Sequence, residues 1–321
     1  MFSIKNLEII TINLSNVCNM KCGICPNGHK HYYINKYALE NKYKKENSKK
    51  DDHFITNFLL TKTAYKIRER LNEIKYDGLI SLNGFGEPLL NPNLNDIVKC
   101  FKGFKTNIIT NGIYLTKVKN NTILATINDN EIETIIDKDK IELILDNIST
   151  IEITLHSSLD YSLSAGIDND KSYYRPFYKI QEIYGEDKIK IRNHNPYDKD
   201  NTLIFNNRNG ALYDYNEICN TKNCNPNFDK LCYYPFYEIM IDSDGKYRFC
   251  AHDWNRKIDF LKDVFNCSIE DFFINDMDMI RRNIVTNNKR MENLCGQCDA
   301  NGRLHGENNF IIFKKEGIKN G

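Results

Sequence analysis

The chain has 321 residues, with 44 lysines and arginines against 43 aspartates and glutamates, so its formal net charge is +1. This balance gives no global attraction to nucleic acid or to an anionic membrane surface. No stretch approaches the roughly 20 apolar residues of a membrane span, and the first residues do not form a signal-peptide pattern. We therefore predict a cytoplasmic protein with no nucleic-acid partner and no membrane partner.

Strand-like and helix-like segments alternate through the first two thirds of the chain. Runs of β-branched and aliphatic residues predict strands at 7–14, 78–83, 106–112, 150–156, 188–192 and 201–205. Periodic apolar positions predict helices at 63–74, 92–103, 140–148 and 178–185. Two longer connections, near 30–60 and 117–140, are predicted as inserted loops. About six repeats of strand and helix predict a parallel α/β sheet, open or curled toward a barrel.

The alternation stops in the last third of the chain. A hairpin is predicted at 237–250 around an Asp-Gly turn, and a helix at 268–285 begins after a serine cap. We therefore predict a first domain at 1–214 and a smaller second domain at 215–321.

The chain contains eleven cysteines. In a reducing cytosol, clustered cysteines indicate metal or redox chemistry rather than disulfides. Cys18, Cys22 and Cys25 follow the first predicted strand, spaced by three residues and then two. Structural zinc takes four ligands, whereas three thiols on one loop suit an iron–sulfur cube with one iron left open. His29 or His31 would complete a zinc site instead, and the spacing alone leaves that alternative open.

A glycine-rich segment with one carboxylate follows the second predicted strand, at 83–92. Gly84 and Gly86 permit close backbone approach, and Glu87 lies at the carboxyl end of the strand, where α/β sheets bind ligands. Alone, this segment is equally well explained as an ordinary turn. Its position one helix and one strand after the three cysteines favours a functional role over an ordinary turn.

Together these motifs resemble those of the radical S-adenosylmethionine (SAM) enzymes. The resemblance rests on the three cysteines, Gly-Glu-Pro at 86–88, Ile-Thr-Asn-Gly at 109–112 and Glu-Ile-Thr-Leu-His at 152–156. It implies a partial (β/α)6 TIM-like barrel with a [4Fe-4S] cluster on Cys18, Cys22 and Cys25. It also implies that SAM binds the open iron and is cleaved reductively to a 5′-deoxyadenosyl radical, which takes a hydrogen atom from the substrate.

The same resemblance implies which residues contact SAM. Gly86 and Glu87 are expected at its amino group. Thr154 and Arg192, near the ends of the fourth and fifth predicted strands, are expected at its carboxylate or ribose. A surface charge at a strand end explains Arg192 equally well. The chain departs from the family pattern at Phe85, which precedes Gly86 where a second glycine is common.

Four further cysteines form a second set: Cys232, Cys250, Cys295 and Cys298. Four thiols close the shell of zinc or of an iron–sulfur cluster, and their spacing alone favours zinc. Their order, with a hairpin glycine before the second and a Cys-x2-Cys pair at the end, resembles the Twitch domain, the shortened SPASM form. With that resemblance we predict a second, auxiliary [4Fe-4S] cluster. The sequence assigns no role to four neighbouring residues: Cys219, Cys224, His252 and Asp253.

These features predict a radical SAM oxidoreductase or epimerase. Its substrate is expected to be small and polar, with a sugar, nucleotide sugar or cyclitol favoured, and its electrons to come from flavodoxin or ferredoxin. One alternative is a peptide-modifying maturase, which usually needs a peptide-recognition domain or a longer C-terminal domain. Another is a zinc-stabilised binding module, which leaves the first three cysteines unexplained.

Overall fold

The computed structural model describes residues 2–20, 25, 58–119, 122–123, 136–155, 174–193, 231–254, 256, 259–291, 295 and 298–317. Several predictions concern residues outside this part of the chain: Cys22, His29, His31, Cys219, Cys224 and the strand at 201–205.

One seven-stranded sheet organises the described chain, in the order β7-β6-β3-β2-β1-β8-β9. Its strands are β1 (Ile9–Ile12), β2 (Leu79–Leu82), β3 (Thr106–Thr110), β6 (Thr150–Leu155), β7 (Ile189–Asn193), β8 (Glu238–Ile241) and β9 (Tyr247–Arg248). All neighbouring strands run parallel except β9, which returns antiparallel beside β8. A separate hairpin is formed by β4 (Val118–Lys119) and β5 (Thr122–Ile123).

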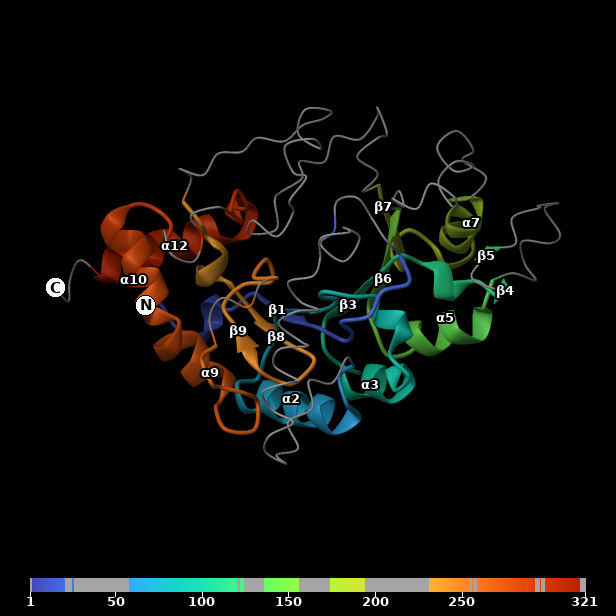
Figure 1. The fold of residues 1–321 in the computed structure, drawn as a ribbon, viewed down its shortest axis with the longest axis horizontal. Coiled ribbons are helices and arrows are strands. Elements are labelled where there is room, and N and C mark those ends of the chain that lie inside the picture. Colours follow the sequence, from blue (N-terminus) through green and yellow to red (C-terminus); the bar gives the residue numbers. More distant parts are fainter. Residues whose placement is uncertain are drawn as a thin grey trace, which may run out of the picture.

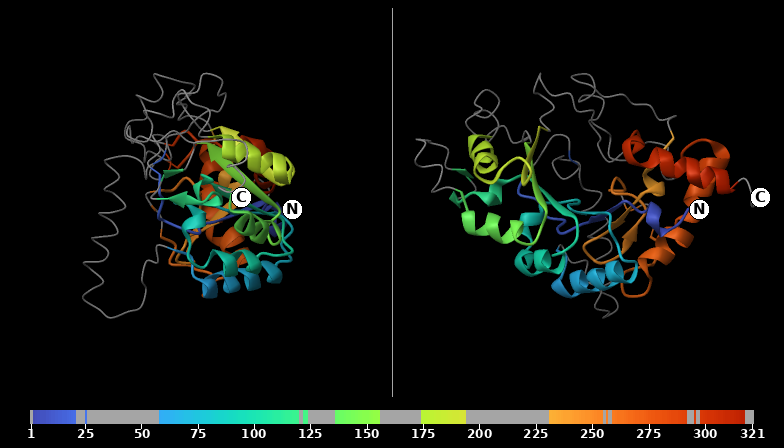
Figure 2. Two further views of the ribbon diagram at one scale, coloured as in Figure 1. Left: turned by 90° about the vertical axis from the view of Figure 1, so that its right-hand side faces the viewer. Right: turned by 180° about the vertical axis from the view of Figure 1, so that it is seen from behind.

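The helices lie along the outer side of the arc that the strands form (Figure 1; Figure 2, right). The first group is α2 (Thr61–Glu73), α3 (Leu94–Cys100), α5 (Lys138–Leu145) and α7 (Arg175–Tyr184). The C-terminal group is α9 (Ile269–Asp271), the π-helical turn η7 (Phe272–Asp276), α10 (Asp278–Asn287) and α12 (Arg303–Gly317). Short 3-10 turns are η1 (Ile4–Asn6), η3 (Pro88–Leu90), η4 (Ile113–Leu115) and η6 (Tyr234–Phe236).

The two faces of the sheet differ in chemistry because side chains alternate along each strand. On β1, Ile10 and Ile12 are fully buried in the same apolar core as Ile67 and Leu71 of α2. Thr11, between them, points to the opposite, inner face. The inner face therefore carries polar side chains, and the outer face makes the core with the helices.

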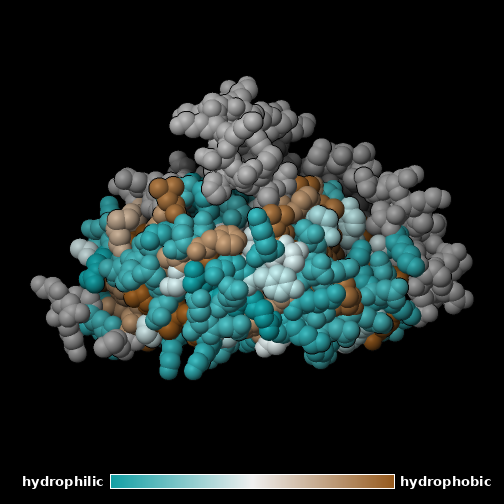
Figure 3. All heavy atoms as spheres, turned by 90° about the horizontal axis from the view of Figure 1, so that it is seen from below, coloured by the Kyte–Doolittle hydropathy of each residue, from teal (hydrophilic) through white to brown (hydrophobic). Residues whose placement is uncertain are grey.

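The side of the molecule that carries α2 and α3 is mainly hydrophilic in Figure 3, with apolar side chains scattered over it. Such a surface fits amphipathic helices that cover a sheet with one face. Within the described residues, no helix combines the length and the hydropathy that crossing a membrane requires.

The predicted α/β architecture with a small C-terminal domain is confirmed. The hairpin expected at 237–250 forms, and its first strand, β8, pairs in parallel with β1. The helix expected at 268–285 is interrupted by the π-helical turn η7. Helix α12 was not predicted; its buried side chains Phe310 and Phe313 pack edge-on against Phe236 and join it to the core.

Candidate functional site

The loop that carries Cys18 lies directly on the Gly-Glu-Pro segment. The Glu87 amide donates a hydrogen bond to the Val17 carbonyl at 2.8 Å. A methyl group on Gly86 would lie 2.5 Å from the carbonyl oxygens of Ser15 and Val17. Only glycine lets these two backbones approach so closely. In the structure, Gly86 thus fixes the start of the three-cysteine loop.

The Glu87 carboxylate ties that segment to the end of β3. It is 3 % exposed and accepts hydrogen bonds from the Thr110 hydroxyl (2.6 Å), the Asn111 amide (2.9 Å) and the Leu89 amide (3.0 Å). Burial raises the pKa of Glu87 to about 7, against the effect of these three donors. Its contact with the SAM amino group remains a prediction.

Two of the three N-terminal cysteines, Cys18 and Cys25, are described, and both are partly exposed. Burial raises the pKa of the Cys18 thiol to about 12, although the Met20 amide donates to its sulfur at 3.4 Å. A metal bound by Cys18 must therefore displace a proton. Cys25 packs against an apolar cluster of Phe85, Met240 and Trp254.

A polar and aromatic junction connects the three-cysteine loop with the segment that begins at Cys250. We call it the central junction; its members are Asn13, Asn16, Phe85, Asp242, Trp254 and Arg256. Asp242 accepts from Asn13 Nδ2 at 2.8 Å and from Arg256 Nε at 2.7 Å. The Arg256 guanidinium also donates to Asn16 and lies over the Phe85 ring, which contacts the Trp254 ring.

Asp242 is the negatively charged member of the central junction. Burial alone would raise the pKa of its carboxyl, but the guanidinium groups of Arg256 and Arg248 hold it below its ordinary value. Asp242 is therefore a buried carboxylate that keeps its charge. It connects β8 with the loop that leads to Cys18.

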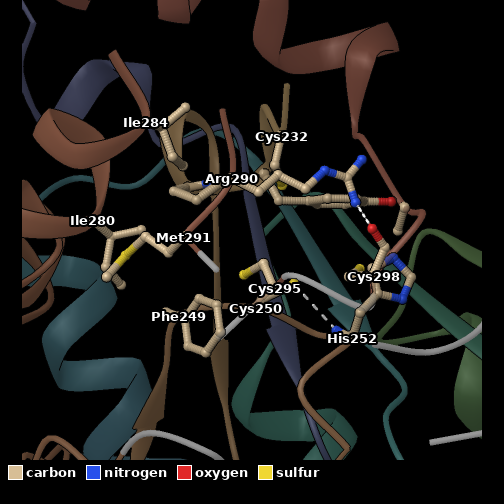
Figure 4. Close-up of a pocket in the computed structure, with 13 residues that line it drawn as sticks. Cys232, Phe249, Cys250, His252, Ile280, Ile284, Arg290, Met291, Cys295 and Cys298 are labelled. Carbon is tan, nitrogen blue, oxygen red and sulfur yellow. Dashed lines mark hydrogen bonds between the residues drawn. The ribbon is translucent and has the colours of Figure 1, made fainter. Parts of the chain in front are cut away.

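The four C-terminal cysteines line one pocket between η6, β9 and α10 (Figure 4). Apolar side chains of Phe249, Ile280, Ile284 and Met291 share the lining with His252 and Arg290. The His252 amide donates to the Cys250 sulfur at 3.3 Å. Asp253 beside it is fully buried.

Burial raises the pKa of all four pocket thiols, that of Cys232 to about 12. Neighbouring thiols add to the effect, since Cys298 raises the pKa of Cys232 and both raise that of Cys295. Four thiols that line one pocket and are shielded from solvent can bind a soft metal centre. Such a centre would stabilise the thiolate forms, which burial disfavours.

The other two predicted SAM contacts lie together on the inner face at β6 and β7. Thr154 pairs with Arg192 in the strand register. The Arg192 guanidinium is half exposed and forms an ion pair with Glu152 at 2.6 Å, and Asn107 also donates to Glu152. The Thr154 hydroxyl is buried and has no hydrogen-bond partner among the described residues.

Sequence reasoning gave no role to several residues of these sites: Asn13, Asn107, Glu152, Asp242, Arg256 and Arg290. Glu152 lies within the motif at 152–156, and the others are polar residues in a strand or loop that belong to no motif. The alternation of β1 and β6 would have placed Asn13 and Glu152 on the inner face, but nothing local marks Asp242, Arg256 or Arg290.

No protein-family model matches the chain, and no curated protein matches it in sequence. Among solved structures it is similar to BtrN in complex with AdoMet and 2-DOIA, with 18 % identity, a TM-score of 0.55, and 91 % of this chain and 93 % of BtrN covered. Selenomethionine BtrN in an open conformation gives 17 % identity and a TM-score of 0.51, with 91 % and 92 % covered.

SuiB from Streptococcus suis, bound to the precursor peptide SuiA, is 15 % identical with a TM-score of 0.40. The match covers 84 % of this chain and 65 % of the SuiB chain. That likeness is too slight to support an argument about this chain. The likeness to BtrN covers nearly the whole of both chains. The chain therefore shares the fold of BtrN, a TIM-like, mostly parallel α/β sheet followed by a small C-terminal domain.

Proposed function

We propose that this protein is a radical SAM enzyme that cleaves SAM reductively and abstracts a hydrogen atom from a small polar substrate. The observation that carries the proposal is the contact between the Cys18 loop and the Gly-Glu-Pro segment. Gly86 brings the two backbones together, and Glu87 fixes them to the end of β3. This places two of the family's motifs side by side at the carboxyl edge of a parallel sheet, where such sheets bind ligands.

Cys18, Cys22 and Cys25 would hold a [4Fe-4S] cluster, which supplies the electron that cleaves SAM. The donor set fits, because Cys18 and Cys25 are partly exposed thiols on one loop and three thiols leave one iron for a further ligand. Glu87 and Gly86 would position the SAM amino group. Thr154, whose hydroxyl has no partner in the described part of the chain, would donate a hydrogen bond to the SAM carboxylate or ribose.

Cys232, Cys250, Cys295 and Cys298 would hold an auxiliary [4Fe-4S] cluster. The pocket that these thiols line is mainly apolar, a setting that tunes the potential of an iron–sulfur centre. This auxiliary cluster would transfer single electrons.

The inner face of the sheet supports a polar substrate. Thr11, Asn107, Glu152 and Thr154 are all buried there, and Arg192 lies at its margin. Hydroxyl, amide and charged groups in this pattern suit a ligand with several hydroxyl or amino groups. BtrN was solved with AdoMet and 2-DOIA. We therefore favour a sugar, nucleotide sugar or cyclitol, oxidised or epimerised, with flavodoxin or ferredoxin as electron donor.

The first test is the iron, sulfide and zinc content of the anaerobically reconstituted protein. About eight irons per chain support two four-iron clusters. About four irons with one zinc would keep the radical chemistry and remove the auxiliary cluster. Zinc without iron would contradict the proposal altogether.

The second test is chemical. With dithionite or reduced flavodoxin, the reconstituted protein is expected to convert SAM to 5′-deoxyadenosine and methionine. Sugars, nucleotide sugars, cyclitols and 2-DOIA are then screened by mass spectrometry. A loss of two mass units indicates oxidation, and an unchanged mass with deuterium uptake from solvent indicates epimerisation. Failure to form 5′-deoxyadenosine with eight irons present would contradict the proposed reaction.

A further inference from the structure

One cation is buried in the wall of the four-thiol pocket. Arg290 is 4 % exposed and lines the pocket with all four cysteines. Figure 4 shows its guanidinium group beside Cys232 and Cys298, away from the apolar side of the pocket. It donates a hydrogen bond to the Cys298 carbonyl, which fixes the plane of the guanidinium group. Sequence patterns gave this residue no role.

The charge of Arg290 reaches the sulfur positions. It favours the thiolate forms of Cys232, Cys295 and Cys298, and thus opposes the effect of their burial. Most of the remaining lining is apolar, from residues such as Phe249, Ile280 and Met291. In such surroundings the interaction between charges is much less screened than in water. Arg290 is therefore placed to act on whatever charge the four sulfurs carry.

We propose that Arg290 raises the reduction potential of the auxiliary cluster, so that the four-thiol site accepts one electron from the substrate radical. This inference rests on the proposed function. Four thiolates and a [4Fe-4S]2+ core carry a net charge of −2, and one-electron reduction makes it −3. A fixed neighbouring cation stabilises the more negative form, and net charge is one of the factors that set such potentials.

The electron balance then favours oxidation of an alcohol. Hydrogen abstraction from the carbinol carbon leaves a radical on that carbon, which still bears its hydroxyl group. With a cluster held by the four thiols as electron acceptor, this radical would become a ketone by losing one electron to that centre and its hydroxyl proton to solvent. An external carrier such as flavodoxin or ferredoxin would then remove the electron. Epimerisation would make no such demand on the potential of the four-thiol site, because the substrate neither gains nor loses electrons overall.

Arginine suits this role better than lysine for fixing geometry, but the charge is what the proposal requires. Arg290→Gln keeps a hydrogen-bond donor and removes the charge. Arg290→Lys keeps the charge and loses the planar group. Arg282→Gln is the matched control, because Arg282 belongs to α10, is half exposed and pairs with Asp278 at the surface.

The experiment is a redox titration followed by electron paramagnetic resonance. It is carried out in a chain with Cys18, Cys22 and Cys25 all changed to alanine, so that the auxiliary cluster alone is observed. Arg290→Gln is expected to move the midpoint potential to a more negative value at an iron content of about four per chain. Arg290→Lys and Arg282→Gln are expected to keep the midpoint of the unsubstituted background.

Several outcomes decide the matter. An unchanged midpoint in Arg290→Gln with full iron overturns the proposal. Loss of iron in both Arg290 variants also overturns it, since the residue would then hold the loop of Cys298 rather than tune the cluster. Loss of iron in Arg290→Gln alone, with a normal Arg290→Lys, overturns it as well, since the charge would then serve to bind the metal rather than to set its potential. Zinc or no metal in the background chain, before Arg290 is changed, shows separately that the pocket holds no cluster. Failure of the radical chemistry is seen in the chain that keeps Cys18, Cys22 and Cys25, as the absence of 5′-deoxyadenosine.

Discussion

The two cysteine regions of this molecule differ in how the chain holds them. Cys18 and Cys25 are partly exposed on a loop that contacts the backbone of Gly86 and Glu87. In the pocket, Cys232, Cys250 and Cys298 are buried and Cys295 is partly buried, and apolar side chains surround them. A centre with three protein ligands can bind a further molecule, whereas four thiols complete a shell by themselves. Under the proposed function, the first region would thus hold the cluster that binds and cleaves SAM, and the pocket would hold a separate electron-transfer cluster.

Removing one thiol from the first region is expected to have the largest effect. Cys18→Ala should abolish SAM cleavage, with at least a roughly 100-fold loss of 5′-deoxyadenosine, because the cluster that supplies the electron loses a ligand. The fold and the auxiliary iron, about four per chain, should remain. Chromatographic assay of 5′-deoxyadenosine with iron analysis measures both. Product at the rate of the unsubstituted protein would remove the first region from the chemistry.

The corresponding change in the pocket is expected to separate the two activities. Cys295→Ala should leave SAM cleavage largely intact and reduce turnover of the substrate, because only electron transfer depends on the pocket. Cys267→Ala is the matched control: this thiol is also buried in the C-terminal part but lies outside the pocket lining. Normal substrate turnover by Cys295→Ala, with iron lost from the pocket, would contradict the electron-transfer role.

The central junction allows a test of how the two regions depend on each other. Asp242→Asn removes a buried charge that pairs with two arginines. Breaking such a pair costs about 3–5 kcal/mol of the free energy of unfolding. Urea unfolding should show this loss, while Asp259→Asn, which breaks a surface pair with Lys246, should cost less than about 1 kcal/mol. Equal effects of the two changes would argue against the junction.

The sequence grouped Cys232, Cys250, Cys295 and Cys298, and the structure places all four in one pocket. For the first set, Cys22 lies outside the described residues, and the ligand roles of both sets remain predictions. The strands could be predicted too, since runs such as Ile-Ile-Thr-Ile at 9–12 have strong β propensity. The central junction could not be predicted from the sequence. The Asn13–Asp242 bond joins residues 229 positions apart, and the Arg256–Asn16 bond spans 240. Arg290 lacked any signal for the same reason, since it is buried in a pocket whose other lining residues begin at Cys232.

A smaller change in the first region tests whether backbone proximity matters. Gly86→Ala should push the Ser15–Val17 backbone away, because its methyl group would lie 2.5 Å from two carbonyl oxygens. Overpacking of this kind costs about 1–3 kcal/mol, and iron loading and SAM affinity should fall. Gly103→Ala, where the added methyl group meets nothing within 4 Å, carries backbone strain alone because its φ is +94°. It should leave both properties unchanged.

The pH dependence of stability tests the buried carboxyl group of Glu238. Burial raises the pKa of Glu238, on β8, from 4.5 to about 7. The folded state then binds the extra proton between these values, so stability should fall as pH rises from about 4.5 to about 7. The slope is at most about 1.4 kcal/mol per pH unit for one group.

Glu238→Gln is expected to flatten that part of the profile and to raise stability at pH 8, because the amide never ionises. Exposed Glu270→Gln serves as the control. Unfolding midpoints at pH 5.5 and pH 8 measure the effect. Profiles that stay parallel for Glu238→Gln and the unsubstituted protein would remove Glu238 as the source of the pH dependence.

The parallel pairing of β1 with β8 has a consequence for synthesis on the ribosome. Strand β1 is complete at residue 12, but its second neighbour ends at residue 241. Until then, Ile-Ile-Thr-Ile has one hydrogen-bonding edge without its native partner, and uncharged β-branched edges attract other strands. Contacts this distant in sequence also slow folding. Fragments that end before β8 are therefore expected to expose an unpaired strand edge that promotes self-association, and the hairpin that covers this edge also carries Cys250.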